Sequence, residues 1–193
     1  PDMGPEGLNE FSRYFYPQLN KEGLIIDDRA NGGGNVSPMI LERLSREPYR
    51  LTMRRGSARI GTVPDAVQVG PKVCLINKYS ASDGDLFPWG FRALGLGKLI
   101  GTRTWGGIVG ISGSLPYMDG TDIRVPFFTS FDPKTGSWII ENHGVDPDIL
   151  IDNDPVKEWN GEDQQLDRAI QEVMKELQDR KPLPGVPTPR DFS

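Results

Sequence analysis

The sequence predicts an α/β domain, because two short apolar segments typical of buried strands each run into a polar turn and then into a helical pattern. The first of these units covers residues 24–46, and the second covers residues 73–94. Both turns contain glycine together with short polar side chains. In folds of this class, backbone donors and side chains converge where the strands end, so we expect the functional groups at these two turns.

Length and composition limit the class of protein. With 193 residues, 36% hydrophobic and 25% charged, the chain is long enough for one domain with a sizeable core. We assign this domain to residues 1–180 and treat residues 181–193, which are rich in proline, as a tail. The formal charge of −5 argues against nucleic-acid binding, and no apolar run approaches the roughly 20 residues of a membrane-spanning helix. A single cysteine, Cys74, excludes an internal disulfide framework.

The first unit follows an amphipathic helix. Apolar side chains recur at helical spacing over residues 7–19, at Leu8, Phe11, Tyr14, Phe15 and Leu19. A buried strand is predicted at residues 24–26, and the turn at residues 31–34 contains three glycines that allow positive φ angles. A second helix is predicted from Ser37 to residue 46, since serine is a good N-cap and Pro38 is tolerated in the first turn.

The second unit is preceded by two short strands, which we expect at residues 51–54 and 59–63. Its own strand is predicted at residues 73–76, and a helix follows over residues 86–94. Pro88 lacks a backbone donor, so we expect this helix to kink or to begin irregularly.

The remainder of the chain starts with a third strand at residues 99–100 and a glycine-rich loop at residues 106–113. We predict strands at residues 123–129 and 137–141, joined by a hairpin turn between them. The clearest helix covers residues 163–177, capped by Asp163, with one apolar face formed by Leu166, Ile170, Val173 and Leu177. Residues 181–189 contain four prolines and should be extended.

Two interpretations exist for each of the two turns. Residues 31–34 are able to present amides to an anion, or they form a simple tight turn. Ser82, at a strand-to-helix junction, is placed either as an exposed nucleophile beside the next residue's N–H or as a helix N-cap. Asp83 and Asp85 favour the N-cap, because carboxylates in a first turn complement the helix dipole.

Longer sequence segments distinguish between the functional and the purely structural interpretations of these two turns. The segments NKYSASDGDLF, at residues 77–87, and LGLGKLIGTRTWGG, at residues 94–107, resemble the C-terminal catalytic subdomain of tricorn core proteases. Residues 24–37, with LIID and NGGGNVS, and residues 140–148, IENHGVDPD, look like that family's other landmarks and occur in the same order. The resemblance implies a crotonase/ClpP-like ββα spiral fold. It also implies peptide substrates, a ring-shaped homo-oligomer and a cytoplasmic location, with the periplasm as the alternative.

The resemblance also assigns roles to single residues. Ser82 would be the nucleophile, and the N–H of Asp83 with that of Gly33 or Gly34 would form the oxyanion hole. Glu141 would be the carboxylate of the catalytic tetrad. The chain would thus be a serine endopeptidase that acts through an acyl-enzyme, without a cofactor or metal.

The sequence lacks a residue that matches the general base of that family. The general base of tricorn proteases is a histidine preceded by serine in a more N-terminal subdomain, whereas the single histidine here, His143, follows Asn142. We therefore expect His143 to lie on the surface, and the chain to be a fragment that is inactive by itself. The related carboxyl-terminal processing proteases use a lysine, but Gly107 stands at the matching position, and neither Lys78 nor Lys98 does.

Two other functions are weighed against the protease. The chain could be a non-catalytic module for peptide binding or assembly, in which the glycine turn and the serine turn bind a peptide main chain without cleaving it. A crotonase-fold enzyme acting on acyl-thioesters is disfavoured, because the string Ser-Asp-Gly-Asp at residues 82–85 has no role there.

Overall fold

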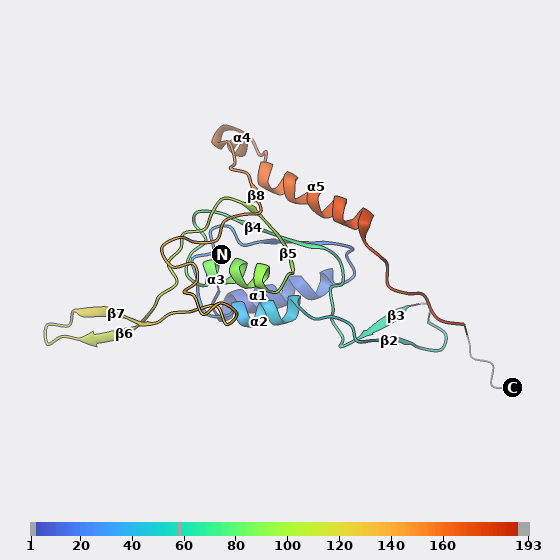
Figure 1. The fold of residues 1–193 in the computed structure, drawn as a ribbon, viewed down its shortest axis with the longest axis horizontal. Helices are drawn as coiled ribbons and strands as arrows, with labels where there is room; N and C mark the ends of the chain where they lie inside the picture. The colour runs from blue at the N-terminus through green and yellow to red at the C-terminus, as the bar shows by residue number, and fades with distance from the viewer. Residues whose placement is uncertain (1–2, 58, 189–193) are drawn as a thin grey trace.

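A four-stranded parallel sheet forms the centre of the molecule in the computed structural model, which describes residues 3–57 and 59–188 (Figure 1). Its strands lie in the order β1 (Leu24–Asp27), β4 (Lys72–Ile76), β5 (Gly97–Gly101) and β8 (Ile149–Leu150). Three of these strands are at the predicted positions, because short apolar runs bounded by turn residues are typical of strands buried on both faces. The predicted α/β class is therefore confirmed.

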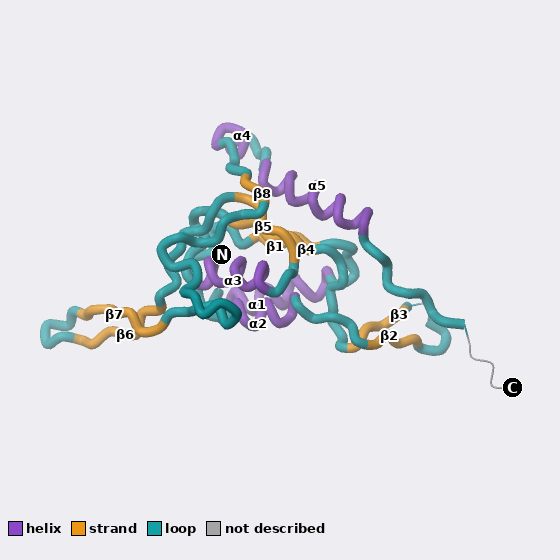
Figure 2. Tube along the Cα trace, viewed as in Figure 1, coloured by secondary structure: helices purple, strands orange, loops and turns teal. Residues whose placement is uncertain are grey.

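Helices cover both faces of this sheet (Figure 2). On one face lie α1 (Pro5–Phe15), α2 (Ser37–Leu44) and α3 (Asp83–Ala93), and on the other lies α5 (Gln164–Asp179). Successive residues of β4 point to opposite faces: Cys74 and Ile76 join the core beneath the three helices, while Val73 and Leu75 join a smaller core beneath α5.

The helices follow the predicted patterns with local differences. Helix α1 ends at Phe15, whose ring stacks on that of Phe11 at 4.9 Å between centroids, and a short 3₁₀ helix, η1 (Tyr16–Gln18), continues it. Asp163 caps α5, since its side chain accepts from the Leu166 N–H at 3.0 Å. Ile170, expected on the buried face of that helix, is 45% exposed, so this part of the prediction was wrong.

Two antiparallel hairpins extend from opposite ends of the molecule (Figure 1). Strands β2 (Arg50–Met53) and β3 (Ile60–Val63) pair at nearly the predicted positions. The other hairpin differs from the prediction, because β6 (Gly110–Pro116) includes part of the expected glycine-rich loop and is the partner of β7 (Asp122–Phe128). The expected partner of β7, residues 137–141, forms only an isolated bridge between Phe131 and Trp138.

The C-terminal part adds a short helix that the sequence analysis missed, α4 (Pro155–Trp159). Residues 181–188 form neither helix nor strand, as expected, and the last residues of the proposed tail lie outside the described part of the chain.

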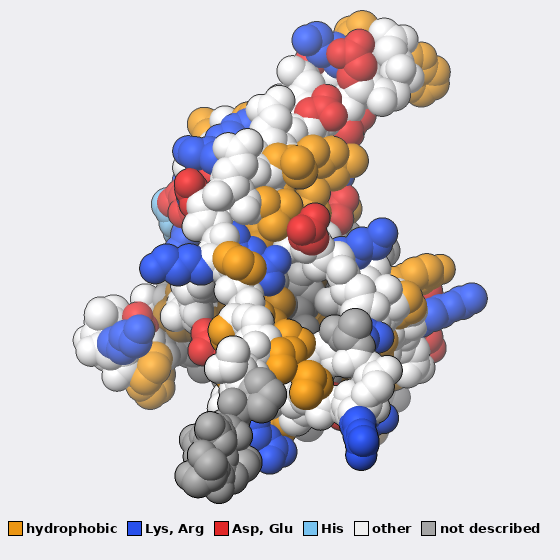
Figure 3. Space-filling model, turned by 90° about the vertical axis from the view of Figure 1, so that its right-hand side faces the viewer, with side chains coloured by type: hydrophobic (Ala, Val, Ile, Leu, Met, Phe, Trp, Pro, Cys, Tyr) orange, Lys and Arg blue, Asp and Glu red, His pale blue; other side chains and the backbone are white. Residues whose placement is uncertain are grey.

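Among the described residues no helix is both long and apolar enough to cross a membrane. Basic and acidic side chains are interspersed on the face shown in Figure 3.

Candidate active site

Ser82 occupies the sharp turn between β4 and α3. It is exposed and is the N-cap residue of α3, with φ 58° and ψ −117°. A positive φ is unusual for any residue other than glycine, so the backbone is strained here. The turn before it is fixed by the Ser80 hydroxyl, which donates to the Asp28 carbonyl at 2.8 Å, and by the Ala81 N–H, which donates to the Asn31 carbonyl at 2.8 Å. The strain is thus maintained by hydrogen bonds to the first glycine-bearing turn.

Gly33, in that first turn, lies against the Ser82 side chain. A Cβ atom placed on Gly33 would be 2.6 Å from the Ser82 Cβ and 3.1 Å from its Oγ, and the φ of Gly33 is +107°. Only glycine satisfies both conditions without displacing Ser82. The structure therefore brings together the two turns that the sequence analysis selected.

The three candidate oxyanion donors are not equivalent. The Gly33 N–H donates to the Asn31 Oδ1 at 3.1 Å and is therefore occupied within its own turn. The N–H groups of Asp83 and Gly34 have no acceptor among the residues that the structure describes. The Asp83 N–H is also the first amide of α3, where the helix dipole favours negative charge.

The Asp83 side chain fixes the position of this first turn of α3. Its carboxylate is buried, and it accepts from the Ser37 N–H at 2.9 Å and from the Ser37 hydroxyl. Ser37 is the first residue of α2, so one carboxylate satisfies amide and hydroxyl donors at the start of a neighbouring helix. The amide of Asp83 is consequently held by a packed pair of helices.

Asp85 connects Ser82 to the glycine-rich segment after β5. Its carboxylate is fully buried and accepts from the N–H groups of Ser82 at 2.8 Å, Gly106 at 2.7 Å and Gly107 at 3.2 Å. From the sequence, Asp85 was predicted only to complement the helix dipole. Its position three residues after an N-cap serine is the capping-box signal that could have identified part of this role.

Glu141 lies at the far end of the same glycine-rich segment. Its Oε2 accepts from the N–H groups of Ile108 at 2.7 Å and Val109 at 2.9 Å, while its Oε1 has no partner in the described part of the chain. The next residue, Asn142, donates its N–H to the Gly106 carbonyl at 2.7 Å. Glu141 and Asp85 are therefore coupled through one short segment, and the free oxygen of Glu141 can accept a further donor.

The other titratable groups considered in the sequence analysis have other partners. His143 is exposed, and its Nε2 is 2.6 Å from the Asp146 Oδ2. Lys98 pairs with Glu172 and Glu176 on α5. Lys78 is exposed, with its Nζ 5.4 Å from the centroid of the neighbouring Tyr79 ring. Across the described residues, there is no group of three or more His, Cys, Asp or Glu side chains placed to hold a metal ion.

Comparison with known proteins identifies the family of proteins to which the chain belongs. The sequence model described as peptidase family S41 matches residues 2–151, which places the chain among the peptidases. The chain belongs to peptidase family S41.

Its relatives include tricorn proteases, which confirms the resemblance seen in the sequence. The tricorn protease of Thermoplasma volcanium is 44% identical over 184 residues, 94% of this chain and 17% of that protein. That of Thermoplasma acidophilum is 43% identical over 190 residues, 97% of this chain and 18% of that protein. The chain therefore spans less than one fifth of the length of these relatives.

Solved structures show the same relationship. A crystal structure of the tricorn protease is 42% identical with a TM-score of 0.82, over 92% of this chain and 17% of that chain. The photosystem II D1 C-terminal processing protease shares the fold at 22% identity and a TM-score of 0.57, over 78% of this chain and 40% of that chain.

Proposed function

We propose that the chain is the catalytic part of a serine endopeptidase, with Ser82 as the nucleophile. The observation that carries this proposal is the exposed Ser82 on its strained turn, beside the free N–H of Asp83 and in contact with Gly33. Family membership and the tricorn relatives support peptides as the substrate class.

The proposed reaction is an acyl transfer from the peptide to Ser82 and then to water. The Ser82 Oγ attacks the peptide carbonyl carbon, and its proton passes to a general base. The carbonyl oxygen becomes negatively charged and accepts from the Asp83 N–H and from a second donor, for which Gly34 is favoured because its amide is free. The C–N bond then breaks as the leaving amine takes the proton, and water hydrolyses the resulting ester of Ser82.

The general base is a histidine outside this chain, as the resemblance implies, so the chain alone would be inactive. Glu141 would orient that histidine through the donor that its free Oε1 accepts. We also propose that the parallel sheet belongs to a crotonase/ClpP-like spiral, and that the complete protein is a cytoplasmic homo-oligomer.

The nucleophile is tested by labelling the complete polypeptide with a fluorophosphonate probe. We expect labelling that is lost in Ser82→Ala and kept in Ser137→Ala, since Ser137 is an exposed serine remote in sequence from both glycine-bearing turns. Labelling that persists in Ser82→Ala would exclude Ser82 as the nucleophile.

The alternative is a module that binds peptides or assembles with other chains without cleaving them. The same free amides favour it, because they are able to bind a peptide carbonyl in its ground state. Absence of fluorophosphonate labelling, together with peptide binding that Gly33→Ala weakens, would favour this alternative.

A further inference from the structure

The two amides favoured as oxyanion donors lie at the beginnings of two different helices. Gly34 is three residues before Ser37, the first residue of α2, and Asp83 is the first residue of α3. Neither N–H has an acceptor among the residues that the structure describes. The relative position of the two amides therefore depends on how the beginnings of α2 and α3 are held together.

Asp83 caps α2 from the neighbouring helix. The N-cap residue of α2 is Val36, which makes no side-chain hydrogen bond to the helix. Instead, the Asp83 carboxylate accepts from the Ser37 N–H at 2.9 Å and from the Ser37 hydroxyl. Asp83 is 3% exposed and Ser37 is 4% exposed, so water does not compete for these bonds. The negative charge also lies at the positive end of the α2 dipole, which strengthens the contact.

The two helices are closely packed behind this pair. A Cβ atom placed on Gly90 of α3 would be 2.5 Å from the Leu41 Cδ1 of α2, so the helices touch at a position that only glycine allows. Densely packed side chains give such a pair little freedom to slide. The bond between Ser37 and Asp83 therefore fixes the end of the pair that lies nearest to the candidate site.

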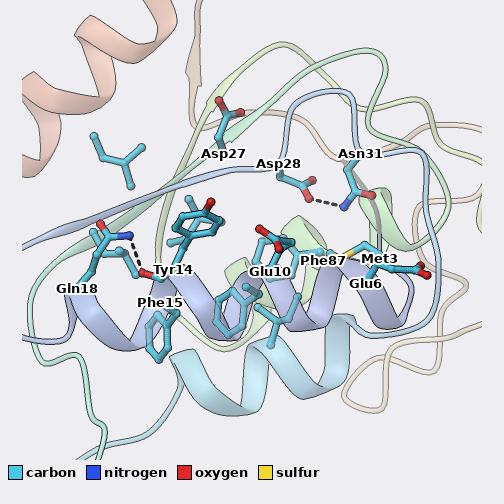
Figure 4. A pocket seen from close by; sticks show the side chains of 16 residues that line it. Met3, Glu6, Glu10, Tyr14, Phe15, Gln18, Asp27, Asp28, Asn31 and Phe87 are labelled. Carbon is cyan, nitrogen blue, oxygen red and sulfur yellow. Dashed lines mark hydrogen bonds between the residues drawn. The ribbon is translucent and has the colours of Figure 1, made fainter.

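The loop that contains Gly34 is fixed to the same end of α2. The Met3 carbonyl accepts from the N–H groups of Asn35 at 2.9 Å and Val36 at 3.2 Å. Figure 4 shows Met3 beside the first turn of α1. A Cβ atom on Gly34 would overlap the Met3 carbonyl group, so the loop and Met3 are in direct contact. Gly34 is thus held between Met3 on one side and the beginning of α2, at Ser37, on the other.

We propose that Ser37 is a positioning residue of the candidate active site, because its bond to Asp83 sets the spacing between the amides of Gly34 and Asp83. This inference rests on the proposed function of Ser82. Ser37 is buried and does not touch the substrate. It acts through geometry, since two donors stabilise one oxyanion only if both reach the same oxygen, and a displacement of about 1 Å is able to cost about a hundredfold in rate.

The test is the rate of fluorophosphonate labelling of the complete polypeptide, at a temperature where thermal unfolding shows each variant to be folded. In this reaction the Ser82 Oγ bonds to phosphorus, fluoride leaves, and the serine proton passes to the general base. The phosphoryl oxygen would accept from the same two amides. Ser37→Ala should lower the rate at saturating probe at least about tenfold, while the probe concentration that gives half of this rate is unchanged.

The matched control is Ser45→Ala, which removes a serine hydroxyl at the other end of α2 and should react like the parent. A purely structural defect gives a different result from displaced amides. Partial unfolding would lower the fraction of molecules labelled at completion, whereas displaced amides slow every molecule and leave that fraction unchanged.

A double-mutant cycle tests whether the two side chains act through their mutual bond. Asp83→Ala keeps the amide of residue 83 and should slow labelling as Ser37→Ala does. The double variant should be no slower than the slower single variant, because each change already breaks the same bond. It also avoids the buried, unpaired carboxylate oxygen that Ser37→Ala leaves.

The outcomes separate this inference from the proposed function. A parent-like rate in Ser37→Ala, an equal loss in Ser45→Ala, or a double variant in which the two losses multiply would overturn the role of Ser37 alone. An unlabelled parent, or labelling that persists in Ser82→Ala, would overturn the proposed function and the role of Ser37 together.

Discussion

The Ser82 N–H donates to the Oδ2 of Asp85 at 2.8 Å, and the Oδ1 of the same carboxylate accepts from the Gly106 N–H at 2.7 Å. One fully buried side chain thus links the strained turn to a segment more than twenty residues away in sequence. The orientation of Ser82 therefore depends on Asp85, although Asp85 is not the nucleophile.

Replacing Asp85 should damage both stability and reactivity. Asp85→Ala leaves the N–H groups of Ser82, Gly106 and Gly107 without their acceptor, and we expect a loss of about 3 kcal/mol in the free energy of unfolding. Urea unfolding measures this loss. At temperatures where the variant is folded, fluorophosphonate labelling should slow at least about tenfold. Asp122→Ala, an exposed carboxylate on β7, is the control, and an equal effect there would contradict this role.

Gly33→Ala tests the contact between the two turns. The added methyl group would lie 2.6 Å from the Ser82 Cβ in a backbone with φ of +107°, so we expect a loss of about 3 kcal/mol and little labelling. Gly32→Ala is a matched control, because a Cβ there has no atom within 4 Å. It should change stability by less than about 0.5 kcal/mol. Similar thermal unfolding of the two variants would refute the contact.

The sequence was sufficient to predict those parts of the fold that depend on local pattern. The strand at residues 73–76 could be predicted because it is apolar on both faces, and the α5 helix because its cap and periodicity agree. The partner of β7 could not be predicted in this way. A strong turn sequence at residues 132–136 favoured the wrong neighbour, while β6 contains glycines that weaken a strand pattern.

The candidate site, like the fold, could be predicted from the sequence only in part. Ser82, Gly33 and Gly34 could be selected as candidates because turn chemistry and resemblance both point to them. The bonds from Gly106 and Gly107 to Asp85 and the free oxygen of Asp28 could not, because each depends on segments distant in sequence. Gly106 reaches Asp85 through the loop after β5, and α1 forms the wall facing Asp28.

The ion pair between Arg29 and Asp163 should make stability depend on acid pH. The hydrogen bond from Arg29 lowers the pKa of Asp163 from 3.8 to about 2, because it stabilises the charged carboxylate. A lowered folded-state pKa gives stability that is present above pH 3.8 and is lost as the pH falls through about 2.

We therefore expect the parent to be more stable than Asp163→Asn by about 1 kcal/mol at pH 7, a value reduced for the partial exposure of the pair. The difference should shrink below pH 3.8, which urea unfolding across this range would show. A difference for Asp163→Asn that stays constant down to pH 2 would contradict the linkage.

Asp28 should have the opposite effect. Burial raises its pKa well above 3.8, and Asp27 and Asp83 act in the same direction, while the hydrogen bond from Asn31 and the positive charge of the amino terminus only partly oppose this. Since the folded state binds the proton more tightly, ionised Asp28 destabilises the fold at neutral pH. This penalty disappears as the pH falls below the unfolded value of 3.8.

Asp28→Asn should therefore be more stable than the parent at pH 7 and about equal to it near pH 3. Thermal unfolding at the two pH values is the measurement. A variant that is less stable than the parent at pH 7 would mean that the ionised carboxylate has a stabilising partner.

The strain at Ser82 gives the last prediction. A non-glycine residue held at a positive φ costs about 1–3 kcal/mol, whereas glycine adopts this conformation without that cost but loses about 0.5–1 kcal/mol more backbone entropy on folding. Ser82→Gly should therefore exceed Ser82→Ala in stability by about 1 kcal/mol in urea unfolding, while both variants lose fluorophosphonate labelling. Ser80→Gly should instead be destabilising, because the buried Ser80 hydroxyl donates to the Asp28 carbonyl. If Ser82→Gly is no more stable than Ser82→Ala, the turn stores no strain, and the exposed position of Ser82 would need another cause.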